Sequence, residues 1–269
     1  MAKVLVVPDA RLNIRRIEHG MELAKRYRAD SVVLMGNYFD PVEGETATMD
    51  DYKKMWEYLK DLARNNMNVI PLIGEHELSY LNCSTRLNGH NGKFRGVIRN
   101  ELVRHQRFMP CVAIDGVLYS NCGVTTEWLR RYKIMLENEI RFRLGKNGGA
   151  ALIENAICKL TNWIPFFDGK KNTASCMRAS VKDLTYSAPP NVPQVVGNAL
   201  VSSPMPMGRI WFVNSVDENE YMMFNNGEPQ MYVYLGEEDD SGPRKHEENN
   251  QKSNKGGKKG NGNDKSGRG

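Results

Sequence analysis

The stretch Val69–Ile70–Pro71–Leu72–Ile73–Gly74–Glu75–His76–Glu77 decides the fold class of this chain. An apolar run of this kind predicts a buried strand, and here it ends abruptly in a glycine and three ionisable side chains. The earlier stretches 4–9 and 32–40 have the same form, and an amphipathic helical pattern over about 49–67 precedes the third strand. The sequence therefore predicts a β-α-β-α-β unit whose parallel strands bring polar side chains to one edge of a sheet, where α/β proteins bind their ligands.

The second half of the chain predicts further strands. Its apolar runs lie at 111–114, 117–120, 194–198, 210–214 and 221–235. Asp115–Gly116 and Asn225–Asn226–Gly227 are strong signals for the turns of two β-hairpins. Helical patterns over about 125–193 predict either a cap over the site or an inserted helical pair that packs on the core. The N-terminal part alternates strands and helices, whereas the C-terminal part consists of strands. This arrangement predicts two sheets rather than one.

Charge is concentrated at the C-terminal end. The chain has 269 residues and a net charge of +5, and the segment from Gln251 onward carries six basic residues and one Asp. The rest of the chain is therefore close to neutral, so the basic balance does not by itself indicate a nucleic-acid-binding fold. Hydrophobic residues vanish after residue 235, and we expect residues 236–269, rich in Lys, Gly and Asn, to be a disordered tail.

Cysteine usage and hydropathy predict the compartment. The five cysteines include no CxxC pair, which favours free, buried thiols in a reducing environment. No apolar run approaches the roughly 20 residues of a membrane span, and the N-terminus lacks the pattern of a signal peptide. We therefore expect a cytoplasmic protein without membrane association.

Five polar segments of the chain resemble motifs of one enzyme family. The segments 9–11, 36–40, 73–81, 120–129 and 195–199 resemble, in this order, Asp-x-His, GDxxD, GNHD, SHAGVT and VVGHT. These are motifs of the calcineurin-like metallophosphoesterases, and the chain is most similar to small bacterial and phage enzymes that resemble serine/threonine protein phosphatases. The resemblance implies an α/β fold of two facing mixed β-sheets flanked by helices, in one metallophosphoesterase-like domain over residues 1–235.

The metal ligands that the resemblance implies are largely replaced. The family uses two divalent metals, roughly 3.5–4 Å apart, which activate a water that attacks phosphorus. The position of its bridging carboxylate is Asn37, and the positions of two metal-binding histidines are Asn121 and Asn198. Arg11 stands where the first motif has its histidine, and arginine has no lone pair to give a metal. Of the expected ligands only Asp9 is unchanged, so we expect neither a dinuclear centre nor another cofactor.

The leading hypothesis is a pseudophosphatase that binds a phosphorylated ligand or protein partner. Arg11, beside Asp9, would take the electrostatic place of a metal and bind phosphate by charge-assisted hydrogen bonds. His76 matches the histidine that protonates the leaving group in the family, and here it would be a vestigial general acid. Arg86 and Arg209 are further candidates for phosphate binding, although each also fits an ordinary surface arginine.

Two alternatives remain open. One is an active phosphomonoesterase or protein phosphatase of low activity, with a single Mn²⁺ or Mg²⁺ held by Asp9, Asp40 and Glu75. The other is a nucleic-acid-associated scaffold in which the basic tail makes nonspecific, salt-sensitive contacts with the phosphate backbone. A tail of this composition is also common as a solvated, solubilising end.

Overall fold

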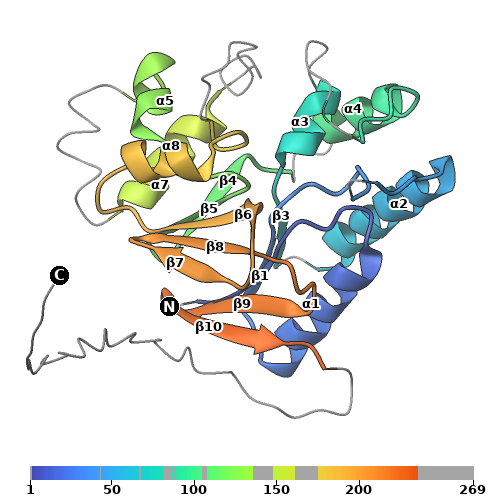
Figure 1. Ribbon diagram of the computed structural model, residues 1–269, viewed down its shortest axis with the longest axis horizontal. Coiled ribbons are helices and arrows are strands. Elements are labelled where there is room, and N and C mark those ends of the chain that lie inside the picture. Colours follow the sequence, from blue (N-terminus) through green and yellow to red (C-terminus); the bar gives the residue numbers. More distant parts are fainter. Residues whose placement is uncertain are drawn as a thin grey trace, which may run out of the picture.

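The computed structural model describes residues 2–42, 44–66, 68–81, 87, 89–104, 108–135, 148–160 and 175–235. The described part of the chain is an α/β protein with two mixed five-stranded sheets (Figure 1). Its strands are β1 (Lys3–Val7), β2 (Ser31–Leu34), β3 (Val69–Pro71), β4 (Cys111–Ile114), β5 (Val117–Ser120), β6 (Gln194–Val201), β7 (Met205–Met207), β8 (Ile210–Ser215), β9 (Glu220–Asn225) and β10 (Glu228–Val233). Its helices are α1 (Ile14–Arg26), α2 (Met49–Asn65), α3 (Glu75–Leu81), α4 (Arg95–Arg104), α5 (Thr126–Arg131), α7 (Gly149–Cys158) and α8 (Val181–Ser187).

Each sheet has a parallel centre and antiparallel additions. The first sheet has the order β10-β9-β1-β2-β3, in which β1, β2 and β3 are parallel and the C-terminal hairpin joins antiparallel to β1. The second sheet has the order β4-β5-β6-β8-β7, in which β5, β6 and β8 are parallel. Parallel neighbours end at the same edge of a sheet, so each sheet presents a row of carboxyl ends that can build a site.

Alternating side chains fill the space on both faces of the first sheet. In β1, Val4 and Val6 belong to a cluster shared by both sheets, which includes Tyr119 of β5 and Val195 of β6. The intervening residues of β1 pack on the other face, where α1 and α2 lie (Figure 1). Because successive residues of a strand point to opposite faces, a strand buried on both faces is apolar throughout. The two sheets therefore face each other across one apolar layer.

Local capping fixes where the first helices begin. Asn13 accepts a hydrogen bond from the backbone N–H of Arg16 at the start of α1, at 3.2 Å. Thr48 and Asp51 form a capping box at the start of α2, in which each side chain bonds the other residue's backbone N–H. Both caps satisfy backbone N–H groups that have no partner within the helix. They therefore fix the residue at which each helix begins after its strand.

Two strand-end loops approach each other so closely that only glycine fits. Gly36 has a positive φ of 96°, and a Cβ added to Gly74 would lie 2.5 Å from the backbone nitrogen of Asn37. No side chain can be placed at that distance from a backbone atom. The loops after β2 and β3 are therefore held together by backbone contact, with their side chains free to form the site.

Replacing Gly74 by alanine should lower the free energy of unfolding by about 2 kcal/mol, because the new methyl group must push the two loops apart. Urea denaturation followed by circular dichroism measures this. Gly92→Ala is the control, since a Cβ at Gly92 meets nothing within 4 Å. Equal stability of the two variants would contradict the proposed close packing of the loops.

Most of the expected elements are confirmed, and two short ones were missed. The strands of the β-α-β-α-β unit, the helix over 49–67 and both hairpins lie where the sequence predicts them. The elements α3 and β7 were not anticipated, and α8 lies in the helical region expected over 125–193 but was not predicted as a separate helix. In the region where a cap or an inserted pair was expected, α7 and α8 pack on the outer face of the second sheet. The tail over 236–269 lies outside the described residues.

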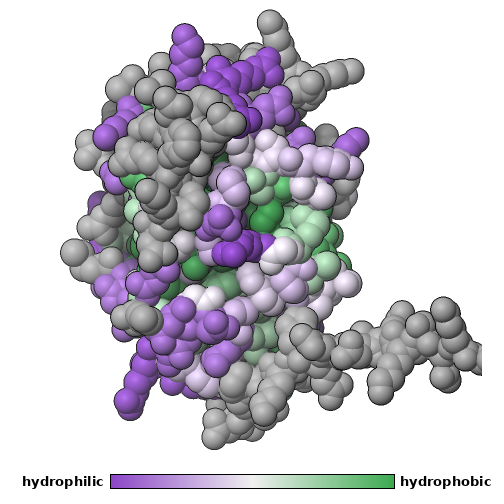
Figure 2. Space-filling view, turned by 90° about the vertical axis from the view of Figure 1, so that its left-hand side faces the viewer, coloured by the Kyte–Doolittle hydropathy of each residue, from purple (hydrophilic) through white to green (hydrophobic). Residues whose placement is uncertain are grey.

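Within the described residues no helix has both the length and the apolar character needed to cross a membrane. Figure 2 shows one face of the molecule, on which apolar residues near the middle are interrupted by strongly hydrophilic ones, and further hydrophilic residues lie toward the top and the bottom. The cytoplasmic location stays a prediction.

Candidate functional site

The polar side chains that follow the strands gather at one edge of the two sheets. Asp9 follows β1, Asn37 follows β2, and α3 begins directly after the loop that ends β3. Asn121 follows β5 of the second sheet, and Asn198 lies within β6 at a shift in its register with β8. A register shift of this kind turns a side chain away from its regular position, and it lets Asn198 reach the first sheet.

Asn37 is the centre of the hydrogen-bond network. It is fully buried, and its amide nitrogen donates to Asp9 Oδ2 at 2.9 Å and to Asn198 Oδ1 at 2.8 Å. Its amide oxygen accepts from the backbone N–H of His76 at 3.0 Å. All the main hydrogen-bonding positions of this side chain are therefore used by protein groups from three different strand ends.

Asn121 joins the second sheet to the first. Its amide nitrogen donates to the backbone oxygen of Met35 at 2.7 Å, and its amide oxygen accepts from the backbone N–H of Glu75 at 3.0 Å. Its backbone oxygen accepts from the N–H groups of Gly197 and Asn198. At this position the amide holds the two sheets together by neutral hydrogen bonds.

Asp9 is a buried carboxyl group with one oxygen engaged. Its Oδ2 lies 3.5 Å from Arg11 Nε in addition to the bond from Asn37, whereas its Oδ1 has no hydrogen-bond partner among the described residues. Burial raises the pKa of Asp9 to about 7, and the hydrogen bond from Asn37 and the positive charge of Arg11 oppose the rise. The free oxygen leaves an acceptor at the base of the site.

His76 and Asp40 form a buried pair. His76 Nδ1 lies 2.6 Å from Asp40 Oδ2, and the other oxygen of Asp40 accepts from the Tyr80 hydroxyl. The pair leaves Nε2 as the remaining polar atom of the His76 ring, and His76 also lines a pocket beside the network. The structure therefore brings Asp40 to His76 and does not bring it together with Asp9 and Glu75, as a one-metal site would require.

Glu75 lies at the side of the network. Asn198 Nδ2 donates to Glu75 Oε2 at 3.3 Å, and Arg178 Nη2 lies 3.6 Å from Oε1. Arg178 precedes α8 and was not among the residues that the sequence singled out. Nothing in the sequence around Arg178 distinguishes it from an ordinary surface arginine.

Glu77 is a second residue whose role the sequence did not distinguish. It is fully buried, and its carboxylate accepts three backbone N–H groups, from Asn37 at 2.6 Å, Tyr38 at 2.7 Å and Gly74 at 2.9 Å. Burial raises the pKa of Glu77, and these three hydrogen bonds oppose the rise. Glu77 therefore fixes the backbone of both strand-end loops rather than facing a ligand.

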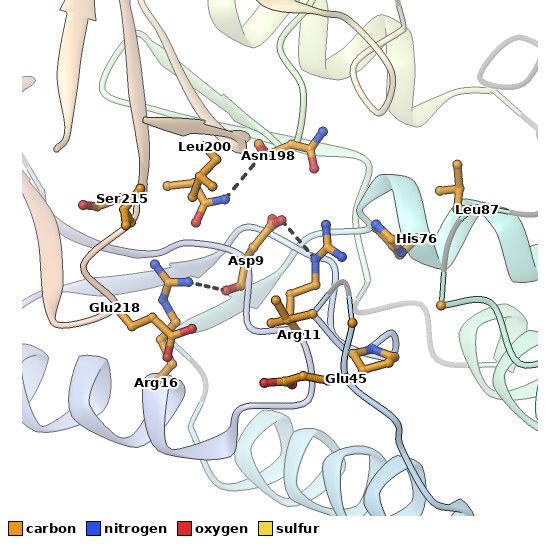
Figure 3. Close-up of a pocket in the computed structure, with 16 residues that line it drawn as sticks. Asp9, Arg11, Arg16, Glu45, His76, Leu87, Asn198, Leu200, Ser215 and Glu218 are labelled. Atoms are coloured by element: carbon orange, nitrogen blue, oxygen red, sulfur yellow. Dashed lines mark hydrogen bonds and ion pairs between the residues drawn. The ribbon is translucent and has the colours of Figure 1, made fainter. Parts of the chain in front are cut away.

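A pocket of about 1020 Å³ opens beside this network (Figure 3). Its polar walls include Asp9, Arg11, Arg16 and His76, and its apolar walls include Leu200. Arg16, at a buried position of α1, was not among the residues that the sequence singled out. Arg209, by contrast, lines a separate cavity of about 670 Å³, and Arg86 lies outside the described residues.

The donor set does not fit a dinuclear metal centre. Among the described residues, no group of three His, Cys, Asp or Glu side chains lies close enough to hold a metal ion. The groups around Asp9 Oδ2 are the amide nitrogen of Asn37 and the guanidinium of Arg11, and both present N–H donors where a metal needs acceptors. Fold and site together define an α/β protein of two mixed sheets with a strand-end pocket whose walls carry both arginine and carboxyl side chains.

Comparisons with known proteins do not assign the chain to a family. No family model matches it, and no curated protein matches it significantly. Among solved structures it has a likeness to TT1561 of Thermus thermophilus, with a TM-score of 0.42 and 12% sequence identity over 87% of this chain and 99% of that chain. A likeness at this level carries no argument about fold or function.

Proposed function

We propose that this chain is a phosphoesterase-like protein that binds a phosphorylated ligand at Arg11 and His76 and does not hydrolyse it. The proposal combines the collinear calcineurin-like motifs with the contacts of the strand-end residues. Arg11 and His76 line one pocket, and the guanidinium of Arg11 is 27% exposed at the side chain, so it remains accessible to a ligand. A guanidinium and an imidazole are ordinary partners of a phosphate group.

The observation that carries the proposal is the position of Asn37. In a metal-dependent phosphoesterase the group here must accept a metal bond, whereas the Asn37 amide nitrogen donates to Asp9 and Asn198. Hydrogen bonds from the Asn37 amide thus bring together side chains that the metals would otherwise hold. In the family's reaction a bound metal generates the attacking hydroxide, so a pocket without metal ligands would bind phosphate without that nucleophile.

The pocket supports binding of a small compound or of a side chain on a partner. Its volume falls at the upper end of the range of small-molecule sites, and its walls combine apolar residues with basic and acidic side chains. Asp40 pairs with His76 and Tyr80, and among the described residues it does not join Asp9 and Glu75 in a group that could hold the metal of the one-metal alternative. The alternative that uses the tail concerns residues outside the described part of the chain.

Replacing Arg11 by glutamine should weaken the binding of inorganic phosphate by about tenfold or more, because a charge-assisted hydrogen bond is lost. Isothermal titration calorimetry on the full chain measures the dissociation constant. Arg209→Gln is the matched control, since it removes the same charge from a different cavity. Unchanged binding in Arg11→Gln, or an equal loss in Arg209→Gln, would show that phosphate does not bind at Arg11.

A further inference from the structure

Arg16 is a buried guanidinium whose hydrogen bonds are only partly made. It is 5% exposed and lines the main pocket. Its Nη1 donates to the backbone oxygen of Asp9 at 2.8 Å, whereas Nε and Nη2 have no hydrogen-bond partner among the described residues. These two atoms form one edge of the planar guanidinium, the edge that binds two oxygens of a carboxylate or phosphate side by side.

The charge of Arg16 is compensated only without direct contact, by the acidic groups of Glu218, Asp9 and Asp217. No ion pair joins Arg16 to an acidic residue of the described part of the chain. Glu218, which lines the same part of the pocket, accepts a hydrogen bond from Asn13 Nδ2 at 2.7 Å instead. Burial lowers the pKa of Arg16, yet arginine stays protonated in proteins. A buried, unpaired charge is costly, and a bound anion would offset that cost.

Two buried acceptors accompany this free edge. Asp9 Oδ1 and Asn214 Oδ1 have no hydrogen-bond partner among the described residues, and the two residues are 3% and 5% exposed. Both residues line the pocket with Arg16. A ligand with two adjacent acceptor oxygens and with donors such as hydroxyl groups would complement these unsatisfied groups. Buried polar groups are almost always satisfied, and a ligand of this composition would satisfy all of them.

The two arginines lie on opposite sides of Asp9. Arg11 contacts its carboxylate and Arg16 contacts its backbone oxygen. Figure 3 shows Arg16 near Glu218 and Ser215, and Arg11 toward His76 and Leu87, with Asp9 between them. A ligand that reaches both guanidinium groups must therefore carry an anionic group at each end and pass over Asp9.

We infer that the pocket binds a phosphorylated polyhydroxy compound with a second oxyanion, which the free Nε and Nη2 edge of Arg16 receives. This inference rests on the proposed function, because the first phosphate lies at Arg11 and His76. The second oxyanion is a phosphate or a carboxylate, since both offer two oxygens to the guanidinium edge. Hydroxyl groups between the two ends donate to Asp9 Oδ1 and Asn214 Oδ1.

Three sugar derivatives test the inference. Glucose 6-phosphate carries one oxyanion, 6-phosphogluconate adds a carboxylate, and glucose 1,6-bisphosphate adds a phosphate. Calorimetry on the full chain should show that at least one of the last two binds about tenfold or more tightly than glucose 6-phosphate, as expected for one bidentate charge-assisted contact. The compound with the larger gain in affinity over glucose 6-phosphate shows whether the second oxyanion is a carboxylate or a phosphate.

Variants of Arg16 connect the gain to this residue. In Arg16→Gln the advantage of the second oxyanion should disappear while the affinity for glucose 6-phosphate stays within about threefold. Arg16→Lys keeps the charge but lacks the planar edge, so it should also lose most of the advantage. Thermal melts of both variants establish that they are folded, and binding of glucose 6-phosphate reports that the Arg11 side is intact.

The outcomes separate this inference from the proposed function. If inorganic phosphate binds in an Arg11-dependent way but the second oxyanion adds nothing, or its advantage survives in both Arg16 variants, the inference is wrong and the proposed function stands. If neither inorganic phosphate nor any of the three sugars binds, both are wrong.

Discussion

Replacing Asn37 by aspartate should lower the free energy of unfolding by at least about 3 kcal/mol, the size expected when a buried charge is left uncompensated. The Asn37 amide nitrogen lies 2.9 Å from Asp9 Oδ2 and 2.8 Å from Asn198 Oδ1. An aspartate would place an acceptor oxygen against two other acceptors, and a second carboxylate beside Asp9 in a fully buried position. Chemical denaturation of the metal-free protein measures the loss.

The hairpin residue Asn226 provides the matched control. Its φ of 57° is close to the 59° of Asn37, so asparagine and aspartate face the same backbone requirement at both positions. Asn226 is exposed, and Asn226→Asp should change stability by less than about 0.5 kcal/mol. If Asn37→Asp is as stable as this control, the amide does not hold the strand ends together, and the structural basis for excluding a metal centre fails.

Replacing Glu77 by glutamine should also lower the free energy of unfolding by about 3 kcal/mol or more. The carboxylate accepts three backbone N–H groups with its two oxygens, two of them at Oε2. The amide nitrogen of glutamine would face at least one of these donors and leave it buried without an acceptor. The measurement is the urea concentration at the midpoint of unfolding of the full chain. A lower midpoint reports lower stability when the slope of the free energy of unfolding against urea concentration is the same in both proteins.

Glu57→Gln serves as the comparison for Glu77. Glu57 is a largely exposed residue of α2 that pairs with Lys60, and exposed pairs of this kind contribute at most about 1 kcal/mol. A small effect for Glu57 and a large effect for Glu77 is the expected result. Similar small effects would mean that the backbone of the two loops does not depend on the buried carboxylate.

The sequence predicts the sheets well because their strands are buried on both faces. β1 and β2 read as continuous aliphatic runs, and the polar residue after each run marks the sheet edge. The hairpin turns at Asp115–Gly116 and Asn226–Gly227 use residues with positive φ, which is why their sequence signal was strong.

The short elements gave no comparable signal. In α3, six of seven residues are buried, so no polar face reveals a helical period. The edge strand β7 has three residues, and Pro206 at its centre argues against a strand. The capping box of Ser180 and Asp183 was readable in the sequence before α8, but seven residues are too few to show an apolar face.

The site was predictable in its location but not in the direction of each side chain. Asp9, Asn37, Asn121 and Asn198 gather as the strand-end rule implies, because that rule depends only on topology. Asp40 follows the same strand as Asn37, yet it bonds His76 on the other side of the loop. Arg16 occupies a buried helical position where its long side chain reaches the pocket. Side-chain direction depends on packing between distant segments, which spacing along the chain does not encode.

The central claim is that a phosphate-binding pocket works here without a metal. Titration of inorganic phosphate into the full chain, once after EDTA treatment and once with Mn²⁺ present, tests this directly, with p-nitrophenyl phosphate as the reporter of turnover in both samples. We predict the same dissociation constant in the two samples and no hydrolysis in either. Phosphate binding that requires Mn²⁺, or Mn²⁺-dependent hydrolysis that is lost in Asp9→Asn, would contradict the account.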